Sequence, residues 1–123
     1  MTVTIIGDET LEKKNKEVIR TFYEEFFNLH RIETADLYVR EDYIQHNPGV
    51  EQGRAGLKRA FAEKFKEHPE FRLNIQMMIA EGDMVAVYLK NVGEDGSTRC
   101  RVVDIYRLEN EMLAEHWDVL QPC

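Results

Sequence analysis

The feature that most restricts the fold is a change in the spacing of apolar residues midway along the chain. From Phe71 onward, apolar and polar residues alternate in four runs, as in β-strands with one buried face. The turns between these runs are short: Glu81-Gly82-Asp83, Gly93-Glu94-Asp95-Gly96 and Glu109-Asn110-Glu111. We therefore predict an antiparallel meander formed by residues 71–79, 84–92, 98–108 and 112–120.

The first half of the chain has the spacing of helices. Apolar residues recur every three or four positions between Leu11 and Phe27, which predicts a long amphipathic helix. We expect a shorter helix over 34–39 and a third one after Gly53, ended by His68-Pro69. Helices followed by antiparallel strands predict an α+β domain with the helices packed on one face of a curved sheet. The space between the two layers would be a natural ligand pocket.

Length and charge exclude several classes of protein. With 123 residues and 43% hydrophobic content, the chain suits one domain over residues 1–123 with a single core. Its formal charge of −7 argues against a nucleic-acid partner, because phosphate backbones would be repelled. No apolar run approaches the ~20 residues of a membrane span, and no signal-peptide cleavage pattern follows the N-terminus. We expect a cytoplasmic protein without membrane contact.

Two of the predicted strands carry titratable side chains among apolar residues. In the run 114–120, alternation places His116 and Asp118 on one face. In the preceding run, Asp104 has apolar neighbours on both sides, where an acid is costly unless it is paired or functional.

The turn between these strands decides whether the three side chains meet. A three-residue loop with a bulge would set Asp104 opposite His116 and place all three on one face. A two-residue turn at Asn110-Glu111 would set Asp104 opposite Trp117 and split the group. We predict the bulged loop, with Trp117 as a core residue on the other face.

A second candidate region is Gln45-His46-Asn47-Pro48, which follows a strand-like start at Tyr43. Pro48 cannot donate to a sheet, so the strand should break there. Loop residues held by a rigid scaffold often carry function. His46 either serves the site or caps a backbone group, and the residues alone leave both open.

These segments match a known pattern. The most specific pieces are Gln-His-Asn-Pro at 45–48 and Glu-His-Trp-Asp at 115–118, supported by residues 80–85 and 103–107. From about the first helix to Gln121, the chain resembles the SnoaL-like polyketide cyclase family of the nuclear transport factor 2-like superfamily. The resemblance implies a cystatin-like α+β cone, with N-terminal helices packed on a strongly curved, mainly antiparallel sheet. One departure is Asn110-Glu111, where many relatives have Asp-Gly.

The resemblance also implies an activity. In characterised cyclases of this family, an aspartate on the final strand acts as general acid/base for an intramolecular aldol closure, without metal or cofactor. By position this role falls on Asp118, while Asp104 matches a pocket-lining position and His46 a pocket-mouth position. The implied ligand is a small, hydrophobic, carbonyl-containing molecule, and isomerisation is a related possibility.

Proton removal next to a carbonyl gives these residues defined tasks. Burial among apolar groups raises the pKa of a carboxylate toward neutrality, as such a base requires, and Asp118 is our candidate. Protonated His116 or His46, or a neutral Asp104, would donate to the enolate oxygen. The predicted substrate-binding residues are Tyr23, Tyr43, Asn47, Tyr106 and Val102.

Three alternatives remain. The first is a non-catalytic module that binds a small ligand and uses these polar residues as a satisfied hydrogen-bond cluster. The second is epoxide hydrolysis by an Asp-Arg-Asp set, for which Arg101 faces the wrong way in the predicted register. The third is a divalent metal held by His46, Asp104, His116 and Asp118; the family offers no support for it, and we expect no metal and no cofactor.

Homodimers are common in this superfamily and form through the exposed face of the sheet. We expect the same here. The apolar residues predicted for that face are Val85, Val87, Leu89, Val103, Ile105 and Trp117.

Overall fold

The computed structural model describes the backbone of residues 6–121 and the side chains of residues 11–121. Helix α1 (Ile6–Phe22) continues as a π-helical segment, Tyr23–Asn28, and a 3-10 turn, Ile32–Thr34, leads into the short α2 (Ala35–Tyr38). The remaining elements are β1 (Val39–Gln45), α3 (Gly53–Glu67), β2 (Arg72–Glu81), β3 (Met84–Val92), β4 (Thr98–Glu109) and β5 (Met112–Leu120). Within residues 6–121, no helix combines the length and apolar character that crossing a membrane requires.

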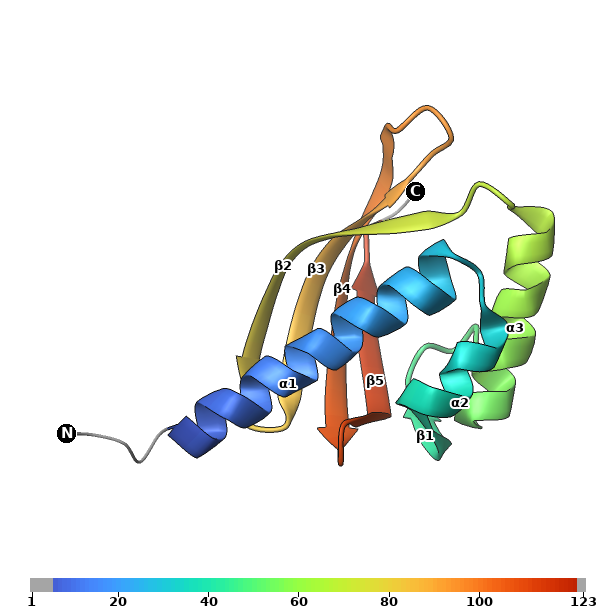
Figure 1. The fold of residues 1–123 in the computed structure, drawn as a ribbon. Coiled ribbons are helices and arrows are strands. Elements are labelled where there is room, and N and C mark those ends of the chain that lie inside the picture. The colour runs from blue at the N-terminus through green and yellow to red at the C-terminus, as the bar shows by residue number, and fades with distance from the viewer. Residues whose placement is uncertain (1–5, 122–123) are drawn as a thin grey trace.

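The strands form one open, mixed sheet in the order β1-β5-β4-β3-β2. Strands β2 to β5 are the predicted antiparallel meander, and β1 adds a fifth strand parallel to β5. Figure 1 shows the sheet curving around α1, which runs across its concave side, while α3 stands at one end beyond β1. The predicted α+β cone is confirmed.

Aromatic side chains fill most of the space between the helices and the sheet. Phe26 and Phe27 from the π-helical segment pack against Phe61 of α3, with ring centroids 5.7 and 5.0 Å apart. From the sheet, buried residues of β3 complete the core. Each such edge-to-face pair adds about 0.5–1.5 kcal/mol beyond the area it buries. This core holds α3 against β1 at the end of the sheet.

The hairpin between β4 and β5 differs from the prediction. Glu109 pairs with Met112 across a two-residue turn, and both turn residues adopt left-handed backbone angles, with φ of 50° for Asn110 and 63° for Glu111. The predicted three-residue bulged loop is therefore wrong. The extra residue is Ala114, which lies inside β5 at a shift of the register. This bulge reverses the alternation of the rest of β5.

The bulge has a direct effect on the candidate site. Beyond it, Asp104 pairs with Asp118, and Tyr106 pairs with His116. All three titratable side chains therefore share the inner face, as predicted, although their partners are not the predicted ones. Trp117 points to the outer face and is half-buried, so its assignment to the core was wrong.

The outer face of the sheet also has a different composition from the predicted one. Val85, Val87 and Leu89 are at most 1% exposed and point into the core. They do so because Val87 lies opposite Asp104 and therefore shares its face. Of the residues predicted for the outer face, Val103, Ile105 and Trp117 remain there, each half-buried.

Candidate active site

A cavity of about 330 Å³ lies between the aromatic core and the inner face of β3, β4 and β5. This volume falls at the lower end of the roughly 300–1,000 Å³ typical of small-ligand sites. Four of the five predicted substrate-binding residues line it, namely Tyr43, Asn47, Tyr106 and Val102. Its other aromatic walls are Phe22, Phe27, Phe61 and Phe71, and its titratable residues near the sheet are Asp104, His116 and Asp118.

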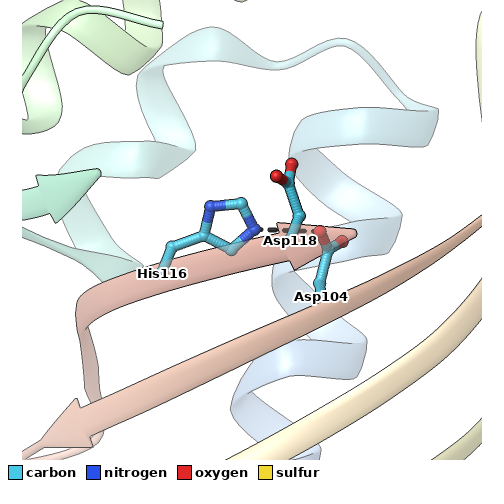
Figure 2. Close-up of side chains that lie close together, drawn as sticks. All are labelled: Asp104, His116 and Asp118. Carbon is cyan, nitrogen blue, oxygen red and sulfur yellow. Dashed lines mark hydrogen bonds and ion pairs between the residues drawn. The ribbon is translucent and has the colours of Figure 1, made fainter. Parts of the chain in front are cut away.

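The three titratable residues converge on one side of two neighbouring strands (Figure 2). Asp104 projects from β4, and His116 and Asp118 project from β5, two positions apart. One ligand-type atom from each of them lies within 4.8 Å of the others. These three could therefore hold a metal ion, but only if His116 and Asp104 gave up the hydrogen bond between them.

Asp104 is the buried centre of this group, with 6% of its surface exposed. One carboxylate oxygen accepts a hydrogen bond from the Tyr23 hydroxyl, and the other lies 2.9 Å from Nε2 of His116. The Tyr23 hydroxyl also contacts that of Tyr106, at 2.9 Å. Because the single Tyr23 proton goes to Asp104, Tyr106 must donate to Tyr23. Tyr23 thus supports Asp104 from behind and does not line the cavity.

Gln45 determines where the protons of His116 lie. Its Oε1 accepts a hydrogen bond from the backbone N–H of Asn47 at 3.0 Å, and a backbone N–H can only donate. The same oxygen lies 2.7 Å from Nδ1 of His116, so Nδ1 must carry a proton. A second proton must then lie between Nε2 and Asp104, since two acceptors facing each other at 2.9 Å would repel. The His116–Asp104 pair therefore contains a proton of its own.

In Asp118, unlike Asp104, only one of the two carboxylate oxygens has a hydrogen-bond partner among the described residues. Its Oδ2 accepts a hydrogen bond of 2.8 Å from Nδ2 of Asn47. The orientation of the Asn47 amide is fixed as well, because its Oδ1 accepts the backbone N–H of Gly49 at 2.8 Å. Among the described residues, nothing donates to the other oxygen of Asp118. One oxygen is thus anchored, and the other is available to a ligand in the cavity.

The loop after β1 is folded so that both amides reach the site. Gln52, just before α3, bonds the backbone of Gln45 twice: its Oε1 accepts the N–H at 2.9 Å and its Nε2 donates to the C=O at 2.6 Å. This clamp brings the loop back onto the end of β1. Gln45 and Asn47 therefore position the titratable residues. The sequence predicted Asn47 as a substrate-binding residue and gave no role to Gln45.

Three buried phenols surround the carboxylates. Burial, and then the charge of Asp104, raise the pKa of Tyr23 and of Tyr106 well above the ordinary value of 10.0. Burial, followed by the charges of Asp104 and Asp118, does the same for the pKa of Tyr43, partly offset by a hydrogen bond with Gln45. All three remain protonated donors. Tyr43 donates its proton to none of the described residues, so that proton is available inside the cavity.

These shifts predict the behaviour of the protein in alkali. A pKa that is raised in the folded state gives stability that is complete below the unfolded value, near 10, and lost as the pH rises above it. With three such phenols, we expect the free energy of unfolding to fall by roughly 4 kcal/mol per pH unit above pH 10. Phenolate absorbance and circular dichroism should show these tyrosines ionising together with unfolding. Tyr43→Phe should reduce the slope by about one third, and ionisation of all three near pH 10 in a folded protein would contradict the assignment.

His46 does not join the cavity. The side chain points to the outer face of the sheet, where its Nε2 lies 2.7 Å from Glu115 and its ring stacks on Trp117 with centroids 4.9 Å apart. The strand alternation explains this position, since His46 follows Gln45, which points inward. Its hydrogen bond, followed by that of Arg107, lowers the pKa of Glu115. The predicted catalytic role of His46 therefore has no support from its position.

Comparisons with known proteins agree with this architecture. The profile of the SnoaL-like polyketide cyclase family matches residues 17–122. Similar solved structures include TsrD from Streptomyces laurentii, at 22% identity and a TM-score of 0.70 over 88% of each chain. Wild-type IdmH from Streptomyces antibioticus has 20% identity and a TM-score of 0.70, over 86% of this chain and 91% of its own. An NTF2-like protein of unknown function from Mesorhizobium loti has 18% identity and a TM-score of 0.72, over 90% and 93%.

No curated protein matches the sequence. At these identities the solved structures show the fold, and the family profile covers most of the chain, including every titratable residue of the cavity. The chain belongs to the SnoaL-like polyketide cyclase family.

Proposed function

We propose that the protein is a cofactor-independent acid/base enzyme that enolises a small, hydrophobic carbonyl compound, leading to an intramolecular aldol closure or an isomerisation. The observation that carries the proposal is the state of Asp118: one oxygen is held by Asn47, and the other faces an aromatic cavity without a partner among the described residues. A base must be free to accept a proton and fixed in direction, and Asp118 meets both requirements.

The remaining residues fit defined steps. The free oxygen of Asp118 removes a proton from the carbon next to the substrate carbonyl, and the electron pair moves onto the carbonyl oxygen. Tyr43 donates a hydrogen bond to that oxygen, as phenols do in other enolising sites. In a closure, the enolate carbon then attacks a second carbonyl of the same molecule, and Asp118 returns its proton to the new alkoxide. In an isomerisation, the proton returns to a different carbon.

This assignment changes the predicted donors. Both nitrogens of His116 and both oxygens of Asp104 are occupied by other side chains, and His46 lies on the other face. The His116–Asp104 pair instead forms a fixed polar wall of the cavity next to Asp118, and the proton between the two side chains stays within the pair. Tyr43, predicted as a binding residue, becomes the donor.

The alternatives have less support. Epoxide hydrolysis by an Asp-Arg-Asp set needs an arginine beside the acids, and none of the described cavity-lining residues is an arginine. Arg101 is exposed on the outer face. A non-catalytic binding module would account for the satisfied Asp104 cluster, but it gives no reason for the half-satisfied Asp118.

Enolisation can be tested without knowing the natural substrate. We expect the protein to speed the exchange of the protons next to the carbonyl for deuterium in aryl methyl ketones and β-keto esters that raise its melting temperature. Nuclear magnetic resonance in D₂O follows this exchange directly. Compounds that bind and stabilise the protein while exchanging no faster than in buffer would favour the binding module instead.

We also propose a homodimer formed through the outer face of the sheet. Apolar side chains cross this face in two rows: Ile79, Ala86, Ile105 and Trp117, and beside them Met77, Tyr88, Val103 and Val119. Ile79, Met77 and Val119 are 64%, 54% and 68% exposed, which is typical of a contact surface. Sedimentation should show a dimer that Ile105→Lys dissociates. A wild-type protein that is only monomeric at micromolar concentration would refute this.

A further inference from the structure

Two polar side chains stand apart from the others that line the cavity. Lys64 of α3 and Asn91 of β3 both line it, but neither makes a side-chain hydrogen bond or ion pair with any described residue. They belong to the same end of the cavity. The Lys64 ammonium lies 5.4 Å from the centre of the Phe71 ring, and Asn91 pairs with Leu73, two residues beyond Phe71.

Lys64 differs from three of the other four cations of α3, which form ion pairs. Arg54 and Lys58 both contact Asp36, and Arg59 contacts Glu51. Lys64 instead turns back over the aromatic wall, with its ammonium 5.9 Å from the Phe61 ring centre and 5.4 Å from that of Phe71. Both rings line the cavity. The ammonium therefore sits where a ligand would leave the aromatic region, and Lys64 is the only lysine or arginine among the described lining residues.

The position of this end relative to Asp118 sets the length of a ligand. Asn91 is level with Cys100 of β4, and Asp118 is level with Asp104, four residues further along the same strand. At about 3.3 Å per residue, the two levels are roughly 13 Å apart. The wall between them is apolar, and includes Leu89 and Val102. A ligand that reaches both ends would be elongated, and the aromatic rings that line the cavity favour a flat one.

We infer that Lys64 and Asn91 form the anion-binding end of the cavity, and that the substrate is a planar keto acid. Its carboxylate contacts the Lys64 ammonium and the Asn91 amide, while its enolisable carbonyl lies between Asp118 and Tyr43. A single ammonium balances the single charge of a carboxylate, and in a protein of net charge −7 it offers a local site for an anion. This inference rests on the proposed function for the position of the carbonyl, but the anion site can be tested separately.

The test uses two probes, 6-acetyl-2-naphthoate and its methyl ester. Both carry an enolisable acetyl group at one end of a rigid ring system, and only the acid carries a charge at the other. Calorimetry should show that the wild-type protein binds the acid roughly 2–5-fold more tightly than the ester, as expected for an ion pair with the exposed Lys64 ammonium. In Lys64→Met this ratio should fall to near one, and in Lys64→Arg it should persist.

Lys66→Met is the matched control, because Lys66 is exposed on the same helix, carries the same charge and does not line the cavity. It should leave the ratio unchanged. An equal fall in Lys66→Met, or a wild-type protein without preference for the acid, including one that binds neither probe, would overturn the inference. Deuterium exchange of the acetyl group reports on the proposed function independently. A Lys64-dependent preference for the acid without deuterium exchange would support the anion site and contradict the proposed enzyme. Deuterium exchange without a preference for the acid would support the enzyme and contradict the anion site.

Discussion

Replacing Asp118 with Asn should lower enolisation of a bound ketone by roughly 10²–10⁴-fold, the usual contribution of a general base. An amide has the shape of the carboxylate but cannot accept the proton. The variant should still fold, because the introduced amide would present its oxygen to Nδ2 of Asn47, which donates to Asp118 in the wild-type protein. Binding of the ketone should change little, so the loss should appear in the exchange rate at saturating ligand.

The control for this experiment lies on the same strand. Glu115→Gln also removes one carboxylate from β5, but Glu115 faces the outer side, where it contacts His46 and Arg107. It should exchange deuterium at the wild-type rate. If Asp118→Asn exchanges as fast as Glu115→Gln, Asp118 is not the base, and the half-satisfied carboxylate must have another role.

The fold was largely predictable because strand periodicity needs no distant information. The alternation of residues 84–92 and 112–120 is visible in the chain itself, and β3 and β5 have those bounds in the structure. The parallel pairing of β1 with β5 was not predictable in the same way. This pairing joins two segments separated in sequence by α3 and three strands, and it depends on the tertiary packing of the whole chain.

The site depended on bulges, which a sequence shows only weakly. A single extra residue in a strand moves all the side chains that follow it to the opposite face of the sheet. The structure has such register shifts in the pairings of β2 with β3, of β3 with β4 and of β4 with β5. The bulge at Ala114 left a trace, because Leu113 and Ala114 are consecutive apolar residues in a strand that otherwise alternates, and both are buried. The prediction placed the bulge in the turn instead. A similar error of one residue in the strand register put Val85, Val87 and Leu89 on the wrong face of the sheet.

Other parts of the site left no trace in the sequence. Gln45 and Gln52 are ordinary amides until the loop folds back and one clamps the other. The same holds for Lys64, which alternates with Glu63 and Glu67 in a pattern typical of a solvated helix face. Only the direction of its side chain, over two aromatic rings, relates it to the cavity.

Replacing His116 with Leu should lower the free energy of unfolding by roughly 3–5 kcal/mol, the cost of breaking a buried charged pair. Asp104 and His116 are 6% and 7% exposed, so contact with bulk water gives little compensation for the lost imidazole. Asp104 would keep only its hydrogen bond from Tyr23, and Gln45 would lose a donor. Urea denaturation should show a lower midpoint with an unchanged slope if the variant still unfolds in one step.

The double variant Asp104→Leu/His116→Leu separates a lost pair from a disturbed core. Two leucines remove the charge together with its partner, so the double variant should be more stable than the sum of the two single losses allows, by roughly 0.5–3 kcal/mol. Asp36→Asn, which breaks an exposed contact with Lys58, should change the midpoint far less than His116→Leu. Strictly additive losses would mean that the two side chains contribute separately, and that the proton placed between them does not join them into one unit.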